Sequence, residues 1–320
     1  MSKVDMHAHL APVVDPAHLD PVLGIAERDG QLVLDGHAVG PRPLYDAGAL
    51  CDYLDRAGLD EAAVSVPPPF FRQHLGAGVR PRWVSLLNEG LLAATGAHAR
   101  LLPLAYLPLE DPDAACAEYL RVRGEPRWAG VVGSAAGASV SLASPDLEPL
   151  WDLLAADRRM LLLHPGTSPD ARLEEMYLAN LLGNPVETAV AAAQLVLGGV
   201  LTRHPGMRVV LVHCGGCVPT VVGRWTRGVD TSRPGLVRQV EDPRAAVRRL
   251  WVDCLAHDAA VVDLAVTTFG EDKLVLGSDW PFPMGTDDPQ SLVDHLPAAL
   301  RIQVATGNAA AALGRTARTV

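Results

Sequence analysis

Histidines and an acidic residue follow short apolar segments in several parts of this 320-residue chain. His7 and His9 are two positions apart in the segment VDMHAH, and because side chains alternate between the faces of a β-strand, both are expected to point to one side. Three later apolar segments end in His164, His213 or Asp279. Three histidines and one aspartate form a suitable ligand set for a divalent metal such as zinc. A fourth histidine, His213, is then left for proton transfer or for polarising a substrate.

The elements that must position these residues alternate regularly along the chain. Short apolar, β-branched segments are separated by helical patterns of ten residues or more, which is typical of βαβ units with a parallel sheet. The predicted strands cover residues 3–9, 62–66, 101–105, 130–132, 160–164, 208–213, 250–253 and 273–277. The predicted helices cover residues 47–57, 81–96, 112–122, 145–157, 185–202, 219–227, 259–269 and 289–299.

Eight strands alternating with helices favour an α/β fold of the (β/α)₈ TIM-barrel type over an open sheet. Residues 1–320 are therefore expected to form a single domain, with the polar residues that follow the strands gathered at the carboxyl end of the barrel, where active sites of such barrels lie. Two connecting segments are longer than a minimal barrel needs. We expect residues 10–45 to form a long loop insertion or lid after the first strand, and residues 166–184 to form an active-site loop.

Composition narrows the possible partners. The formal net charge of −10 at pH 7 has the wrong sign for binding nucleic acid. The longest apolar segments fall short of the 18 to 20 residues or so that cross a bilayer, and the N-terminal residues lack the apolar region of a secretory signal. We therefore expect a cytoplasmic protein with no membrane partner. Five cysteines in a chain with 49% hydrophobic residues are expected to stay reduced, because a large core needs no disulfides.

Taken in order, several short motifs resemble those of one enzyme family. They are DMHAH at 5–9, SVPPP at 65–69, HP at 164–165, NPVET at 184–188, HCGG at 213–216, DCLAHD at 253–258 and GSDWPFP at 277–283. This order resembles the amidohydrolase superfamily, and within it the branch of 2-amino-3-carboxymuconate 6-semialdehyde decarboxylase and the related aromatic-acid decarboxylases. The resemblance covers most of the chain.

The resemblance implies roles for the residues of the first paragraph. His7, His9, His164 and Asp279 would hold the metal, and His213 would be the catalytic histidine. Apart from the resemblance, we expect Asp279 to assist His213 in proton transfer. The family also implies the barrel fold, a homodimer, and a metal that is either zinc, our preferred ion, or manganese.

Lysine usage bears on the number of metal ions. Many hydrolases of the superfamily hold two metals bridged by a carbamylated lysine on the fourth strand, and this chain has only Lys3 and Lys273. Lys3 precedes the first metal-binding motif and Lys273 begins the last predicted strand, so neither can take that place. One divalent metal ion per chain is therefore expected.

Further residues are candidates for contact with substrate. Arg42, in the first long loop, lies close to where the resembling decarboxylases carry a substrate-binding arginine, although a solvated surface arginine is the alternative. Phe70, Trp280 and Phe282, together with the neighbouring Phe71, are expected to line the pocket unless they serve packing alone. His257 is expected to orient another group of the site by hydrogen bonding. Its neighbour Asp258 can equally act as a plain helix cap.

Three functions fit this set of residues. The first is a metal-dependent, non-oxidative decarboxylase, a carboxy-lyase acting on a small unsaturated or aromatic carboxylic acid; the family resemblance favours it. The second is a mononuclear metal-dependent hydrolase of an ester, lactone or amide, or a hydratase, that uses the same site. The third is a barrel that keeps a metal for structural reasons, which the open, histidine-rich ligand set disfavours.

Overall fold

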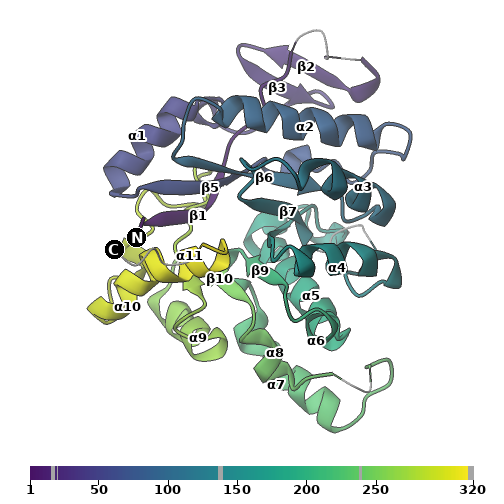
Figure 1. Ribbon diagram of the computed structural model, residues 1–320, viewed down its shortest axis with the longest axis vertical. Coiled ribbons are helices and arrows are strands. Elements are labelled where there is room, and N and C mark those ends of the chain that lie inside the picture. The colour runs from purple at the N-terminus through teal and green to yellow at the C-terminus, as the bar shows by residue number, and fades with distance from the viewer. Residues whose placement is uncertain (16–18, 20, 136–139, 238–239, 316–320) are drawn as a thin grey trace.

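Eight parallel strands form a barrel with helices around it (Figure 1). The computed structural model describes residues 1–320 except 16–18, 20, 136–139, 238–239 and 316–320. The barrel strands, in their hydrogen-bonded order, are β1 (Val4–His9), β5 (Glu61–Ser65), β6 (Leu101–Leu107), β7 (Gly130–Ala135), β8 (Met160–Pro165), β9 (Arg208–Leu211), β10 (Trp251–Asp253) and β11 (Leu274–Val275). The predicted (β/α)₈ fold is confirmed.

The barrel closes between the first and the last strand. Isolated parallel bridges join Asp5 to Leu276 and Ala8 to Trp280, just beyond the short β11. The Ser278 side chain strengthens this seam by donating to Asp5 Oδ2 at 2.5 Å. The first and last barrel strands are thereby held side by side, although they come from opposite ends of the chain.

The barrel strands are buried along almost their whole length because helices cover their outer side. Every residue of β1 and of β8 is buried, as expected for parallel strands packed on both faces. Strand direction and burial together place His7 and His9 inside the barrel and His164 near its carboxyl end.

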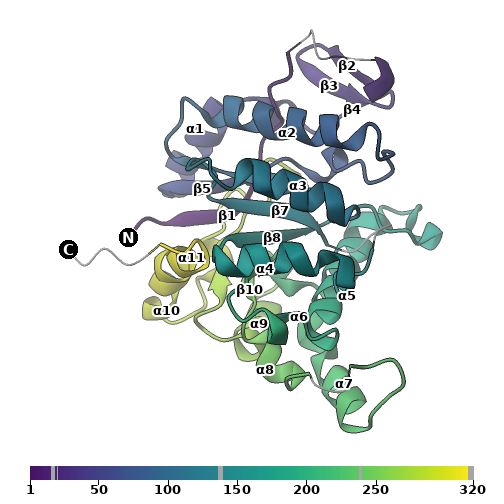
Figure 2. The ribbon, with the colours of Figure 1, turned by 45° about the vertical axis from the view of Figure 1, so that its right-hand side comes forward.

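The helices wrap the barrel, as the two ribbon views show (Figures 1 and 2). They are α1 (Ala47–Ala57), α2 (Arg80–Thr95), α3 (Pro112–Val122), α4 (Glu148–Ala156), α5 (Asn184–Leu197), α6 (Val200–Arg203), α7 (Val218–Asp230), α8 (Pro243–Val247), α9 (Ala259–Phe269), α10 (Ala298–Ile302) and α11 (Asn308–Ala312). Aspartate caps begin several of them: Asp46 accepts from Ala49 N, and Asp258 accepts from Ala260 N. The cap role considered for Asp258 is thus observed.

Two predicted helices differ from the structure. The helix expected over residues 185–202 is divided into α5 and α6, because Gly199 has a φ of 72° that ends the first helix. The helix expected over residues 289–299 is absent from these described residues apart from its last two positions. A 3₁₀ turn, Ser291–Val293, stands there, and α10 starts only after Pro297, whose ring is incompatible with a helix interior.

The insertion predicted after β1 is present, and part of it forms a small sheet. Residues 25–38 contain three antiparallel strands: β2 (Ile25–Arg28), β3 (Gln31–Leu34) and β4 (His37–Ala38). Asp29-Gly30 and Asp35-Gly36 make the two turns, and all four residues have positive φ, which is the requirement of tight hairpin turns. This sheet lies beyond α2 at one end of the molecule (Figure 1).

No helix in the described part of the chain is both long and apolar enough to cross a membrane.

Candidate metal centre and active site

Four ligand side chains meet at the carboxyl end of the barrel. His7 and His9 come from β1, His164 from β8, and Asp279 from the loop after β11. One ligand atom from each lies within 4.8 Å of those of the other three, and all four residues are buried. The structure therefore brings together the four residues that the sequence singled out as metal ligands.

The histidine nitrogens that face the centre of this cluster make no hydrogen bond to the described part of the chain. They are the Nε2 atoms of His7, His9 and His164, and all three are buried. Asp279 Oδ1 lies 3.1 Å from His9 Nε2 and 3.5 Å from His7 Nε2. Buried polar atoms without partners are costly, so three of them directed at one carboxylate fit a divalent metal between them.

The opposite nitrogen of each ring is held by the protein. Asp253 Oδ2 lies 2.8 Å from His7 Nδ1, and Ser65 Oγ lies 3.1 Å from His9 Nδ1. The carbonyl oxygen of Pro165 accepts from His164 Nδ1 at 2.9 Å. Such contacts set the ring orientation and the tautomer, so that Nε2 is left as the lone-pair donor toward the centre.

Asp253, the last residue of β10, connects two parts of the site. Besides His7 Nδ1, its carboxylate accepts from the backbone N–H groups of His213 at 3.0 Å, Cys214 at 2.7 Å and Leu255 at 3.1 Å. Asp253 begins the motif DCLAHD, from which the sequence predicted no role for this residue. The only sequence signal was an acidic residue at the end of an apolar strand, the pattern that also marked Asp279.

His213 lies beside the ligand cluster on an unusual turn. Its Nε2 is 3.9 Å from Asp279 Oδ2, and 15% of its side chain is exposed, whereas the side chains of His7 and His9 are completely buried. His213, Cys214, Gly215 and Gly216 all have positive φ. A side chain at Gly216 would place its Cβ 2.2 Å from the carbonyl oxygen of Pro185, so this residue must be glycine.

Asp279 is also held in a left-handed conformation, with φ of 58°. Its N–H donates to the carbonyl oxygen of His7 at 2.7 Å. The preceding Ser278 donates from Oγ to Asp5, and Asp5 in turn accepts from Tyr53 OH at 3.0 Å. This network fixes the carboxylate of Asp279 over the two histidines of β1.

Electrostatics favour the metal-binding form of Asp279, His164 and His9. Burial raises the pKa of Asp279, but His7, His213 and His9 outweigh it, so the pKa of this carboxyl lies well below its ordinary value and it is ionised. Burial and the neighbouring histidines lower the pKa of His164 well below its ordinary value, and burial also lowers the pKa of His9. Both imidazoles are therefore neutral near pH 7, the form that binds metals. At His7, burial lowers the pKa, but the carboxylates of Asp279 and Asp253 outweigh it and raise the pKa above its ordinary value.

A cavity with two lobes opens at this cluster. The larger lobe, about 410 Å³, reaches His164 and Asp279, and the smaller one, about 240 Å³, reaches Asp279 and His213. Four residues line both lobes: Asn180, Asn184, Asp279 and Met284. The cavity has the size of a small-molecule site.

The predicted aromatic residues lie at different places. Phe282 lines the larger lobe, and its ring centroid lies 5.5 Å from that of His9 in a T-shaped arrangement. Phe70 is fully buried and stacks on Trp83, whereas its neighbour Phe71 faces His164 with ring centroids 6.3 Å apart. Of this pair, Phe71 is therefore the one near the metal ligands.

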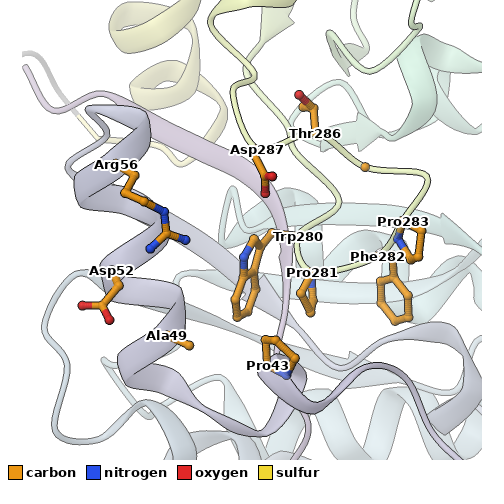
Figure 3. Close-up of a pocket in the computed structure, with 11 residues that line it drawn as sticks. Pro43, Ala49, Asp52, Arg56, Trp280, Pro281, Phe282, Pro283, Thr286 and Asp287 are labelled. Atoms are coloured by element: carbon orange, nitrogen blue, oxygen red, sulfur yellow. The ribbon is translucent and has the colours of Figure 1, made fainter.

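Trp280 lines another hollow, of about 420 Å³, together with Pro43, Arg56 and Phe282 (Figure 3). Its indole ring stacks on Tyr53 with centroids 5.9 Å apart. Arg42, at the start of the 3₁₀ helix Arg42–Tyr45, is exposed and is not among the residues that line either lobe of the metal cavity.

His257 lines the smaller lobe and is exposed, with φ of 56°. Its Nε2 lies 2.8 Å from the carbonyl oxygen of Met284, which joins the loop after β10 to the loop after β11. The described contact that orients the ring of His7 is made by Asp253 instead.

Comparison with known proteins agrees with this architecture. The model of the amidohydrolase family matches residues 4–315, which is nearly the whole chain. This protein belongs to the amidohydrolase family. A 2-amino-3-carboxymuconate-6-semialdehyde decarboxylase of Dictyostelium discoideum is 27% identical over 319 residues, covering 92% of this chain and 86% of that protein. The counterpart from Caenorhabditis elegans is 25% identical, covering 88% of this chain and 86% of that protein.

A solved structure shows the same fold. The 5-carboxyvanillate decarboxylase of Sphingomonas paucimobilis has a TM-score of 0.81 at 21% identity, and the match covers 98% of this chain and 99% of that one. A dihydroxybenzoic acid decarboxylase from Polaromonas sp., crystallised with bound manganese, has a TM-score of 0.77 at 17% identity, over 98% of this chain and 97% of that one.

Proposed function

We propose that this protein is a metal-dependent, non-oxidative carboxy-lyase that removes carbon dioxide from a small unsaturated or aromatic carboxylic acid. The observation that carries the proposal is the buried cluster of three unpartnered Nε2 atoms and Asp279, with His213 beside it. Nearly full-length similarity to proteins named decarboxylases favours the lyase over a hydrolase with the same ligands.

The ligand residues prepare the site for a carboxylate. His7, His9, His164 and Asp279 would hold one divalent ion, which when bound supplies positive charge that anchors and polarises the substrate carboxylate. Asp253, Ser65 and the Pro165 carbonyl keep the three rings directed inward, so little rearrangement is needed on loading.

His213 is placed to move the proton that the reaction needs. Decarboxylation breaks the bond between the carboxyl carbon and its neighbour and replaces it with a C–H bond. A proton from the His213 imidazolium adds to that neighbouring carbon, the conjugated system accepts the positive charge, and the electrons of the broken C–C bond restore conjugation as carbon dioxide leaves. The Asp279 carboxylate lies 3.9 Å from His213 Nε2, and the exposed edge of His213 gives the ring access to protons from solvent.

We also propose which metal the site binds, how many ions each chain holds, and where and in what assembly the protein occurs. We propose zinc as the ion because a buried set of three imidazoles and one carboxylate suits it, with manganese as the alternative that related crystal structures contain. Within the described residues, His7, His9, His164 and Asp279 are the group found with metal-ligand geometry. Lys3 contacts Gln290 and Lys273 contacts Asp272, so neither lysine lies at this site. Both observations support one ion per chain. We further propose a cytoplasmic homodimer.

The test combines metal content with product analysis. Protein purified without a histidine tag should contain about one zinc or manganese per chain and should release carbon dioxide from hydroxylated benzoic or muconic acids. The His213→Ala variant should keep its metal and lose about 10²- to 10⁴-fold in kcat, the usual contribution of a general acid. Full activity of this variant, or a product that has gained water and kept its carboxyl carbon, would overturn the proposal. Light scattering of the same samples measures the mass of the assembly.

A further inference from the structure

Two asparagine side chains lie beside the metal ligands without a role in the metal cluster. Asn180 and Asn184 line both lobes of the cavity, next to Asp279, and both are half-buried. Within the described part of the chain, their hydrogen bonds use main-chain atoms: Asn180 N donates to Tyr177 O, and Asn184 O accepts from Thr188 Oγ1. The two side-chain amides are therefore available to a ligand.

The backbone that carries these amides is firmly placed. Asn180 is part of a π-helical turn, Ala179–Gly183, that runs directly into α5 at Asn184. Single π-turns of this kind are uncommon and are frequent at functional sites. Farther along α5, Glu187 is buried and accepts from Ser168 Oγ at 2.7 Å, which ties the 166–184 segment to the helix.

The start of α5 is also packed against the turn of His213. Cys217 N donates to the carbonyl oxygen of Pro185 at 3.3 Å, and Gly216 approaches the same carbonyl so closely that no Cβ fits. Asn184 is thus held at a constant position relative to His213. The backbone at Asn184 is therefore preorganised, so binding there costs little backbone ordering.

The chemistry of an amide restricts what it recognises. A carboxamide both donates and accepts hydrogen bonds and carries no net charge, so it matches a hydroxyl or carbonyl group and does not neutralise a second carboxylate. The neighbouring residues of the larger lobe include Pro68, Phe282 and Met284, which offer apolar surface to a flat ring.

We propose that Asn180 and Asn184 are specificity-determining residues that hydrogen-bond a neutral hydroxyl or carbonyl substituent of the substrate while its carboxylate lies at the metal ligands. This inference rests on the proposed function, and it narrows the substrate class to ring or conjugated carboxylic acids that carry such a substituent.

The experiment measures binding, not turnover. Dissociation constants of benzoate and of 2-, 3- and 4-hydroxybenzoate are determined by calorimetry on the zinc-loaded protein. In the wild type, a hydroxyl at one or more ring positions should tighten binding about 3- to 10-fold relative to benzoate, the contribution of one net hydrogen bond. Asn180→Leu or Asn184→Leu, which keep the approximate volume, should abolish that gain and change benzoate binding less than about 2-fold.

Matched controls separate recognition from folding. Leu182→Asn alters an exposed position of the same π-turn and should leave the hydroxyl gain intact. Metal content and circular dichroism are checked for each variant, and Asn184→Ala replaces Asn184→Leu if the larger side chain prevents folding. Equal weakening of benzoate and its hydroxylated forms, or an unchanged hydroxyl gain in both asparagine variants, would overturn the proposal. A protein that shows the gain and its loss but releases no carbon dioxide would overturn only the proposed decarboxylase activity.

Discussion

Two buried carboxylates at the same end of the barrel, those of Asp253 and Glu110, differ in how many hydrogen-bond donors surround them. Asp253, at the end of β10, accepts from three backbone N–H groups and contacts the ring of His7. Glu110, which follows β6, is buried without a hydrogen-bond partner for either side-chain oxygen within the described residues, and the nearest cation is Arg80 Nε at 3.5 Å. The comparison therefore sets a carboxylate that is saturated with donors and holds geometry against one whose pKa is raised by burial.

The largest effect is expected when Asp253, the carboxylate that is saturated with donors, is replaced. Asp253→Asn replaces an acceptor oxygen by an NH₂ group that faces other donors. We expect metal affinity to fall about 10- to 100-fold and the free energy of unfolding to fall by about 3 kcal/mol. Metal retention during dialysis against a chelator and urea denaturation measure the two quantities.

The control for this variant is Asp258→Asn, because asparagine caps a helix as well as aspartate does and α9 should keep its start. If Asp253→Asn retained wild-type metal affinity, the carboxylate would not be what orients His7.

Glu110 provides the second prediction, through pH. Burial raises the pKa of Glu110 from 4.5 to about 7. The folded chain therefore binds one proton more than the unfolded chain between these values, and the stability that this proton supplies is lost as pH rises from 4.5 through about 7. Glu110→Gln should add about 2 kcal/mol at pH 8 and little at pH 4.5 or below.

Urea unfolding at both pH values measures this difference, with the exposed Glu271→Gln as the matched control that should change nothing. An equal effect of Glu110→Gln at the two pH values would show that the Glu110 side chain does not titrate in this window.

The smallest effect is expected at Asp5, another buried carboxylate that accepts several hydrogen bonds. Tyr53 OH is one of the donors to Asp5, alongside Ser278 and the N–H of His7. Tyr53→Phe removes this donor and keeps the stacking on Trp280, so we expect a loss of about 1 kcal/mol in unfolding free energy and unchanged metal content. A loss as large as that of Asp253→Asn would mean that the remaining donors do not hold Asp5 in place.

The barrel and the ligand cluster were predictable because their signals are local. The apolar segment that ends in His164 predicts both a strand and the direction of the histidine side chain. The His-x-His pair at the start of the chain does the same. Aligned parallel strands then bring their carboxyl ends together whatever the intervening sequence is.

The supporting contacts were not predictable in the same way. Asp253 acts through backbone N–H groups of the His213 turn, about 40 residues away, and backbone donors leave no mark on residue type. Phe70 and Phe71 are adjacent aromatic residues with opposite surroundings, and only the 3₁₀ turn at Pro68–Phe70 decides which one faces His164. The Asp-Gly turns of the insertion, by contrast, were a readable hairpin signal that the expectation of a loop overlooked.

The seam between β1 and the segment after β11 has a consequence for how the molecule is made. Asp5 and Ser278, the hydrogen-bonded pair at that seam, are 273 residues apart, and Asp279 follows directly. During synthesis the chain emerges N-terminus first, so His7 and His9 leave the ribosome long before the carboxylate that completes their ligand set exists. A nascent or truncated chain thus presents a bare histidine pair to any metal ion in the cell, and the complete four-residue ligand set becomes available only when the last strand closes the barrel.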